Sequence, residues 1–295
     1  MTADEPLQTE PTSLYTEALQ HPRGEAAYRP HLGGAAFFDL DRTLISGASV
    51  YIFAKAALKK GLFPRSRVLR DGMSAASFKL FGASDEQADA IRARLLGAVA
   101  GVQQSDLLAL SSETVPDLLA KVRPEALELV EWHRTAGRQT FIVSASAQEL
   151  VEPLAAALGM TGGIGTVSEV VDGAYSGKLV GPFCYGPGKA VAIRELADWE
   201  GLDLGRCYGY SDSASDLPML EAVGHPVAVN PDGPLARKAE ERGWPVVRFH
   251  RRTRKVVRRT SLAMGAAAIA GGAFAAGLRV GRTGIGLAVQ VGGRR

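Results

Sequence analysis

Cysteine is scarce in this sequence of 295 residues, which holds only Cys184 and Cys207. Two cysteines cannot build a disulfide framework or a multi-cysteine zinc module, and so few are typical of a reducing compartment. Aromatic residues make up 7 % of the chain, charged residues 22 % and hydrophobic residues 46 %. These near-average fractions exclude wholesale disorder and a membrane protein with several spans. The chain is long enough for one large domain, or for one domain with an insert.

The N-terminal region lacks the features of a secretory signal. Asp4 and Glu5 stand where a signal peptide carries basic residues, and no apolar run follows within the first thirty residues. Residues 1–33 show little periodicity, so we interpret them as a mobile N-terminal arm. We therefore expect the catalytic chemistry to take place in the cytoplasm.

Acidic residues are absent from the C-terminal part of the chain. Residues 248–295 contain 11 Lys and Arg and no Asp or Glu, so the rest of the chain has a net charge of −8 although the whole has +3. Seven of these basic residues fall within 248–259, and the next 19 residues, 260–278, are uncharged and rich in Ala and Gly. We interpret 248–295 as a basic and apolar tail that could attach the protein to the inner face of the cell membrane, by spanning it or lying on it.

Two other interpretations of the tail stay open. A disordered tail would need no partner at all. Nucleic-acid binding is disfavoured because the basic block lacks aromatic interleaving.

Short apolar runs predict a buried parallel sheet. Uninterrupted runs of this kind are typical of strands covered on both faces. The predicted strands are Ala35–Phe38, Gln139–Val143, Cys207–Tyr210 and Pro226–Val229. A helix is predicted over Pro124–Thr135, with proline in its first turn and Gly137 after its end. We therefore expect an α/β fold with a doubly wound, Rossmann-like parallel sheet.

About a hundred residues without a convincing strand separate the first two predicted strands. A loop of this length without structure is improbable. The predicted helices are Ala48–Lys60, Ser84–Ala100 and Ser105–Val122. We expect residues 46–122 to form a helical cap inserted into a catalytic core of residues 34–45 and 123–247.

Two local motifs add detail to the second half of the chain. Asp172-Gly173 lies between the alternating segments 166–171 and 174–179, which predicts a β-hairpin. Ser146-Ala147-Gln148-Glu149 has the spacing of a capping box and is predicted to open the next helix.

Polar groups suited to phosphate chemistry follow the predicted strands. Asp39 and Asp41 lie two apart at the end of the first strand, so both side chains are expected to point the same way. Ser144 ends the second strand, Asp212 follows the third, and Lys189 opens a helix predicted over 188–199. Alone, an Asp-x-Asp pair is most often a helix cap and a lysine a solvated charge. Together and in this order, the aspartate pair, the serine, the lysine and the later aspartate form a specific signal for phosphate chemistry.

These motifs resemble the haloacid dehalogenase superfamily, and within it the phosphoserine-phosphatase-like subclass with a helical cap after the first strand. The resemblance runs from Ala35 to about Phe249, and the segment 215–231 is similar to a bacterial hydrolase branch of that subclass. It implies that Asp39 is the nucleophile and Asp41 the general acid/base.

The same resemblance assigns the remaining groups. It implies that Ser144, Thr43 and Lys189 bind the phosphoryl group, with Lys189 also part of the catalytic set. Asp212 and Asp216 match the acidic motif of the family, although Ser211 and Ser213 stand where glycine is usual. Both acids are in place, so we do not interpret this departure as loss of function.

The physical chemistry of phosphate esters supports these roles. Their hydrolysis is very slow in water, so catalysis must neutralise charge and position a nucleophile. A carboxylate can attack the phosphate dianion only when their repulsion is cancelled, which a bound Mg²⁺ would do. Asp39, the backbone carbonyl of Asp41 and the carboxylate of Asp212 would supply its ligands. Asp216 would orient a metal-bound water or Lys189.

The sequence thus predicts an enzyme, a Mg²⁺-dependent phosphatase acting on a small phosphate monoester. P-type ATPases and dehalogenases of the superfamily lack an acid at the position of Asp41. Phosphoserine phosphatases carry a glutamate nine residues after the nucleophile, where this chain has Ala48, so phosphoserine is not the expected substrate. Arg42 is interpreted as a solvated surface arginine.

A second function class stays open. The high Ala, Gly and Arg content is similar to that of actinobacterial proteins, among which phosphatase-like members are linked to developmental control, for example of morphological differentiation. The alternative is therefore a regulatory protein that uses a phosphatase fold for binding.

Overall fold

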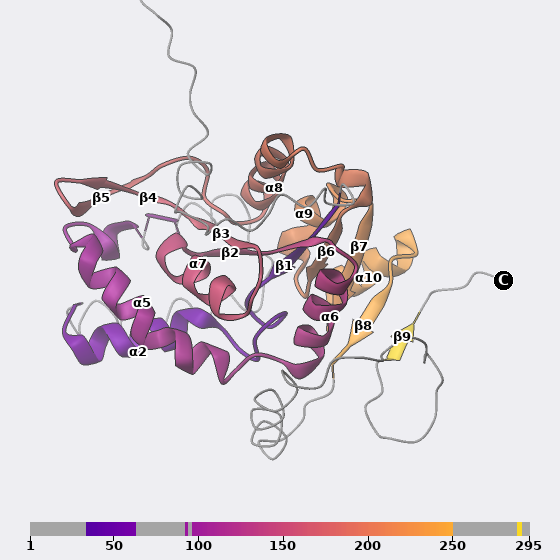
Figure 1. Ribbon diagram of the computed structural model, residues 1–295, viewed down its shortest axis with the longest axis horizontal. Helices are drawn as coiled ribbons and strands as arrows, with labels where there is room; N and C mark the ends of the chain where they lie inside the picture. Colours follow the sequence, from indigo (N-terminus) through magenta and orange to yellow (C-terminus); the bar gives the residue numbers. More distant parts are fainter. Residues whose placement is uncertain (1–33, 63–91, 94–95, 250–287, 291–295) are drawn as a thin grey trace, which may run out of the picture.

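The computed structural model describes residues 34–62, 92–93, 96–249 and 288–290, in which a seven-stranded sheet lies between helices on both faces (Figure 1). The strands in spatial order are β3 (Gly162–Thr166), β2 (Gln139–Ala147), β1 (Ala35–Asp39), β6 (Tyr208–Ser211), β7 (His225–Val229), β8 (Val246–Arg248) and β9 (Ala288–Gln290). Neighbours pair in parallel except β8 and β9, which are antiparallel. The predicted doubly wound parallel sheet is confirmed, because the chain proceeds outward from β1 in one direction and then in the other.

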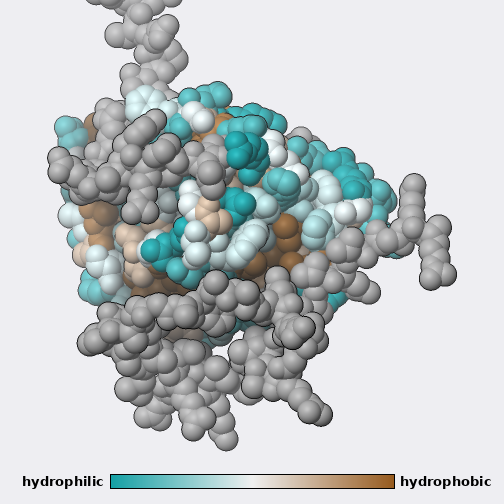
Figure 2. Space-filling view, turned by 45° about the vertical axis from the view of Figure 1, so that its right-hand side comes forward, coloured by the Kyte–Doolittle hydropathy of each residue, from teal (hydrophilic) through white to brown (hydrophobic). Residues whose placement is uncertain are grey.

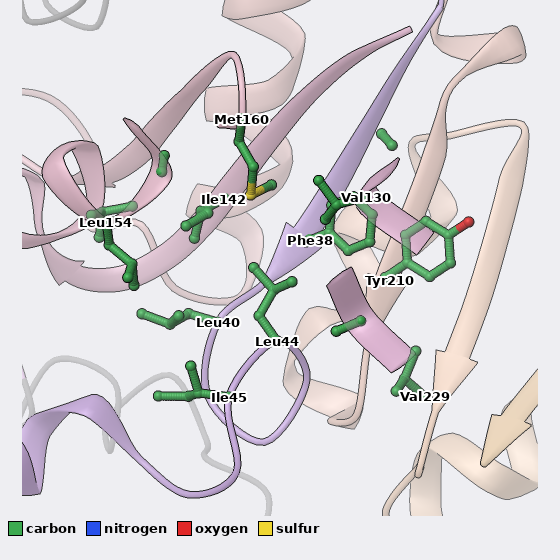
Figure 3. Packing of buried hydrophobic residues seen from close by; sticks show 14 of the residues in the cluster. Phe38, Leu40, Leu44, Ile45, Val130, Ile142, Leu154, Met160, Tyr210 and Val229 are labelled. Carbon is green, nitrogen blue, oxygen red and sulfur yellow. The ribbon is translucent and has the colours of Figure 1, made fainter. Parts of the chain in front are cut away.

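Alternate residues of β1 enter two separate cores, as expected for a strand buried on both faces. The helices are α2 (Ser49–Lys60), α5 (Gln104–Leu119), α6 (Pro124–Thr135), α7 (Gln148–Ala157), α8 (Pro187–Glu200), α9 (Leu217–Glu221) and α10 (Gly233–Arg242). Phe37 packs on the face covered by α8, α9 and α10, whereas Phe38 packs on the face of α6 and α7 (Figure 3). Burying each of these rings stabilises the sheet by about 1.5–3 kcal/mol.

A stacked aromatic pair joins β1 to β6 in the second of these cores. The rings of Phe38 and Tyr210 are nearly parallel, with centroids 4.5 Å apart (Figure 3). Phe38 directly precedes Asp39, and Tyr210 lies two residues before Asp212. The stacking therefore helps to fix the carboxyl ends of the two strands side by side.

The predicted helices around the sheet are found close to their expected bounds. The α6 helix has the predicted bounds, and α2 ends at Lys60, directly before Gly61, whose φ of 71° is a left-handed conformation that glycine adopts without a Cβ penalty. The α5 helix packs against both α2 and α7. The predicted helix 84–100 lies mainly outside the described residues.

The predicted hairpin is present and contacts the segment before α5. Strands β4 (Ser168–Val171) and β5 (Ala174–Leu179) flank Asp172 and Gly173, both of which have a positive φ, as a type I′ turn requires. The backbone N–H of Tyr175 donates to the carbonyl of Val102 at 2.9 Å, and the N–H of Gln104 donates to that of Gly173 at 2.9 Å. The segment between β1 and α6 is thereby attached to the hairpin.

The same inserted segment is also attached at its root. The N–H of Ser46 donates to the carbonyl of Lys121 at 2.8 Å, and the N–H of Arg123 donates to that of Leu44 at 2.9 Å. These two bonds bring the residues that enter the insert next to the residues that leave it.

The sheet extends further along the chain than predicted. Residue 248 was expected to begin the tail, but Arg248 ends β8, and Phe249 is buried with its N–H donating to Oδ1 of Asn230 at 2.9 Å. Strand β9 also comes from within the predicted tail. The basic block and residues 260–278 otherwise lie outside the described residues, as does the N-terminal arm.

The described surface carries a few isolated apolar side chains. Trp132 on α6, Val171 at the hairpin and Trp199 on α8 are exposed. Hydrophilic residues cover much of the face in Figure 2. Single exposed apolar residues of this kind are ordinary in globular proteins. In the part of the chain that the structure describes, no helix has the length and apolar character needed to cross a membrane.

Candidate active site

Four predicted site residues meet at the carboxyl ends of the central strands. Asp39 ends β1, Asp212 follows β6, Ser144 lies in β2, and Lys189 lies in the first turn of α8. All four are buried. The strand order reverses beside β1, and α/β sheets place their binding sites at such a switch point.

Lys189 bridges two of the predicted acids. Its Nζ lies 2.6 Å from Oδ1 of Asp39 and 2.8 Å from Oδ2 of Asp216. The hydroxyl of Ser211 donates to the same oxygen of Asp216 at 2.7 Å. Asp216 therefore contacts Lys189, one of the two partners predicted for it, and Ser211 has a structural reason to replace the usual glycine.

A chain of serines links Asp41 to Ser144. The backbone N–H of Ser49, the first residue of α2, donates to Oδ1 of Asp41 at 2.7 Å. The hydroxyl oxygens of Ser49 and Ser146 lie 2.9 Å apart, and the N–H of Ser146 donates to Oγ of Ser144 at 3.2 Å.

The capping box predicted at Ser146 is wrong. Strand β2 continues to Ala147, which precedes α7 and makes no side-chain cap. The Ser146 hydroxyl pairs with Ser49 instead, and Glu149 accepts from the hydroxyl of Tyr175 at 2.6 Å. Tertiary partners have replaced the local hydrogen bonds that the spacing indicated.

The interpretation of Arg42 as a solvated surface arginine is also wrong. Its Nε lies 2.7 Å from Oδ2 of Asp212, and its side chain is 37 % exposed. The φ of Arg42 is 65°, a left-handed conformation that costs a residue with a Cβ about 1–2 kcal/mol. The loop after β1 thus brings a guanidinium against the predicted metal ligand.

The acidic loop after β6 is held by further polar contacts that the sequence did not indicate. Ser213 accepts a hydrogen bond from the N–H of Ser215, at the start of the short helix η2 (Ala214–Asp216). The N–H of Asp232 donates to the carbonyl of Asp212 at 2.8 Å, and its carboxylate accepts from the N–H of Ala214 at 3.2 Å. Asp232 also caps α10, so it joins that helix to the loop.

Burial raises the pKa of the site carboxyls. For Asp39 the pKa is raised to about 8, because burial and the charges of Asp216 and Asp212 outweigh Lys189. Burial also raises the pKa of Asp212 to about 7, although Arg42 opposes the shift. The pKa of Asp41 is raised by burial as well, against the opposing effect of two hydrogen bonds from Ser49.

The pKa of Lys189 moves the other way from what burial alone would cause. Burial disfavours the ammonium, but Asp216 and Asp39 raise the pKa of Lys189 above its ordinary value. Lys189 therefore stays charged at neutral pH and supplies a fixed positive charge in the site.

Thr43 is buried, but the structure gives its hydroxyl no role. Its Oγ1 has no hydrogen-bond partner among the described residues. The predicted contact of Thr43 with a phosphoryl group stays a prediction.

The donor set suits Mg²⁺. In the described ranges no three His, Cys, Asp or Glu side chains form a metal-binding group. Mg²⁺ needs only one or two carboxylates beside carbonyl oxygens and retained waters, so Asp39, Asp212 and the Asp41 carbonyl would suffice. With Asp41 protonated, the carboxylates of Asp39, Asp212 and Asp216, when ionised, still outnumber the cations Lys189 and Arg42 by one, so the site favours added positive charge.

Comparison with known proteins identifies related chains. The family model for haloacid dehalogenase-like hydrolases matches residues 36–221. An inhibition of morphological differentiation protein from Streptomyces azureus is 46 % identical over 222 residues, covering 75 % of this chain and 80 % of that protein. A phosphoserine phosphatase from Mycobacterium tuberculosis is 41 % identical over 249 residues, covering 83 % of this chain and 80 % of that protein.

A solved structure extends this similarity to the fold. A protein of unknown function from Bordetella pertussis Tohama I superimposes with a TM-score of 0.64 and 32 % identity. The match covers 72 % of this chain and 97 % of that one. Nearly the whole of that protein thus corresponds to one part of this chain.

Proposed function

Since the chain belongs to the haloacid dehalogenase-like hydrolase family, we propose that this phosphatase hydrolyses small phosphate monoesters through an aspartyl-phosphate on Asp39, with Mg²⁺ as cofactor. The observation that carries the proposal is the contact of Lys189 with both Asp39 and Asp216 beside the end of β6. This arrangement places Asp39 next to a fixed positive charge inside a buried site, and that charge opposes the effect of burial and favours the ionised, nucleophilic form of Asp39.

In the first step, a carboxylate oxygen of Asp39 attacks phosphorus and the bond from phosphorus to the leaving oxygen breaks. Lys189 contacts Oδ1 of Asp39, so we assign the attack to Oδ2. Asp41 gives its proton to the leaving oxygen, and its raised pKa supports a protonated acid at the start. The products of this step are a neutral alcohol and phosphorylated Asp39.

In the second step, water attacks phosphorus and the bond between Asp39 and phosphorus breaks. Asp41, now ionised, takes a proton from the water, and phosphate leaves. Ser144 and Lys189 donate hydrogen bonds to the phosphoryl oxygens in both steps. Asp39, Asp212 and the Asp41 carbonyl would hold Mg²⁺, which when bound neutralises charge on the phosphoryl oxygens.

The test uses the full chain and p-nitrophenyl phosphate. We expect hydrolysis with MgCl₂, no hydrolysis after EDTA, and at least a ~10³-fold loss in Asp39→Asn, because an amide is a poor nucleophile. Asp198→Asn, at an exposed position of α8, is the matched control. Mass spectrometry of acid-quenched protein should find phosphate on the peptide that contains Asp39. Full activity of Asp39→Asn would overturn the mechanism.

A regulatory function by binding is the second candidate. It is favoured by the relative from Streptomyces azureus whose name refers to inhibition of morphological differentiation. Expression of the chain and of Asp39→Asn in a differentiating actinobacterium separates the two functions. Equal effects of both proteins on differentiation would support binding, and an effect of the active protein alone would support turnover.

A further inference from the structure

Asp41 is held by a residue that lies outside the family motif. The backbone N–H of Ser49 contacts Oδ1 of Asp41 at 2.7 Å, and Ser49 is fully buried at the first turn of α2. Because Oδ1 accepts this hydrogen bond, the proton of the protonated acid is expected on Oδ2. The contact thus selects which oxygen faces the leaving group.

The hydroxyl of Ser49 continues the contact toward Ser144. Its Oγ lies 2.9 Å from Oγ of Ser146, a distance at which one hydroxyl donates and the other accepts. Either hydroxyl can be the donor in this pair, because each serine carries one proton and two lone pairs. The pair therefore links the start of α2 to the end of β2 in both orientations.

At its Ser144 end, this series of hydrogen bonds contacts the hydroxyl that is proposed to bind phosphate. The backbone N–H of Ser146 donates to Oγ of Ser144 at 3.2 Å. This bond uses a lone pair of Ser144 and not its proton, so the hydroxyl keeps its O–H for a second partner. One backbone segment thus supports both the donor to the phosphoryl group and the partner of Ser49.

We propose that Ser49 and Ser146 are positioning residues that hold the acid Asp41 and the phosphate-binding Ser144 in a fixed relation across β2 and α2. The proposal rests on the proposed function, because it takes Asp41 as the general acid. It assigns neither serine a contact with substrate. The serines act by keeping the proton donor aimed at the leaving oxygen while the phosphoryl group is held.

The dependence of kcat/KM on the leaving group tests this role. A well-aimed acid matters little for p-nitrophenyl phosphate, whose leaving group needs no proton, and much for phenyl and propyl phosphate. Ser49→Ala keeps the backbone N–H bond to Asp41 and loses the hydroxyl link to Ser146, so we expect it to change kcat/KM little on p-nitrophenyl phosphate and to reduce it about fivefold on propyl phosphate. Ser49→Pro removes the N–H at the first helical position, where proline is tolerated, and should reduce kcat/KM about 30-fold on propyl phosphate. Ser146→Ala should act in the same direction but less strongly, and Ser146→Thr, which keeps the hydroxyl, should restore the rate on propyl phosphate.

Controls separate this role from a loss of structure. Ser112→Ala on the exposed face of α5 should leave the ratios of kcat/KM between the three esters unchanged, since the Ser112 hydroxyl bonds only to the carbonyl of Leu108 in the described structure. The double variant Ser49→Ala with Ser146→Ala should lose little more kcat/KM than Ser49→Ala alone, because the effects of two residues that share one hydrogen bond are not additive. A loss in Ser49→Ala that is equal for all three esters, or no loss, would overturn the proposal.

The same assay distinguishes failure of the proposed function. Asp41→Asn removes the acid itself and should show a stronger leaving-group dependence than either serine variant. If the parent protein hydrolyses none of the esters, or if Asp41→Asn leaves the dependence unchanged, the proposed function fails. If Asp41→Asn behaves as expected and Ser49→Ala does not, only the positioning role fails.

Discussion

The Nε of Arg42 lies 2.7 Å from Oδ2 of Asp212, so an arginine contacts a carboxylate that is proposed to bind Mg²⁺. Both the occupied oxygen and the positive charge oppose a second cation at this position. We expect Arg42→Ala to tighten Mg²⁺ binding about threefold to fivefold, since a partly exposed ion pair contributes up to about 1 kcal/mol.

Calorimetric titration of the substrate-free protein with MgCl₂ measures this change directly. Arg242→Ala is a matched control, because Arg242 forms an ion pair of the same 2.7 Å length with Glu221 at a comparable exposure. Unchanged or weaker Mg²⁺ binding in Arg42→Ala would show that Arg42 does not oppose the cation.

Substrate choice is expected to reflect the small side chain of Ala48. This residue precedes α2, where phosphoserine phosphatases carry a glutamate, and alanine offers no partner for an ammonium group. We expect a lower kcat/KM for L-phosphoserine than for glycerol phosphate and other esters without an amine. A preference for L-phosphoserine, as the name of the relative from Mycobacterium tuberculosis suggests for that protein, would require another carboxylate at the substrate amine.

Gly188 controls the position of Lys189. A Cβ at this residue would lie 1.8 Å from the carbonyl oxygen of Phe183, so the start of α8 would have to shift. We expect Gly188→Ala to lower kcat/KM on p-nitrophenyl phosphate by about 100-fold, because small displacements of catalytic groups are costly. Gly233→Ala is the control, since an added Cβ there meets only the side chain of Arg237 at 3.8 Å. Normal activity of Gly188→Ala would contradict the view that the close approach of Gly188 to Phe183 fixes the position of Lys189.

His133 should make stability depend on pH. Its Nε2 lies 2.8 Å from the hydroxyl of Tyr210, and burial, with the charge of Arg138, lowers the pKa of His133 to about 3. Unfolded histidine has a pKa of about 6.5, so between that pH and about 3 the unfolded chain binds a proton that the folded chain does not. The free energy of unfolding should therefore fall as the pH decreases through this window, by at most about 1.4 kcal/mol per pH unit from this residue.

Urea unfolding of the wild type and of His133→Gln at pH 7 and pH 5 measures that contribution. The variant should lose less stability between the two pH values, whereas His225→Gln at an exposed position of β7 should behave like the wild type. Identical pH dependence in His133→Gln and the wild type would exclude His133 as a source of the effect.

Local sequence patterns predicted most of the fold. The apolar run 35–38, the helix 124–135 and the Asp172-Gly173 turn each carry their own signal, because strand burial, helix ends and type I′ turns depend on neighbouring residues. Strand β8 carries no such local signal, because its three residues are too few to show the alternation of a strand.

The site was predicted less evenly. The motifs predicted that Asp39, Lys189 and Asp212 lie close together, and in the structure Lys189 contacts Asp39 while Asp212 follows β6, the strand next to β1. The contacts of Ser49 and Ser146 depend on how α2 meets β2, which residues 97 positions apart in the chain do not reveal. Spacing alone therefore favoured a capping box at Ser146, where a distant hydroxyl competes successfully.

The hydrogen bonds of the insert to the hairpin have a mechanical consequence. The segment between β1 and α6 is attached at Ser46 and Arg123, and again at Gln104 and Tyr175. Two separated attachments, together with the packing of α5 on α7, mean that displacing the described part of the insert breaks at least one set of contacts. Because Ser49 lies only three residues from the first attachment, the beginning of α2 is anchored where its N–H meets Asp41.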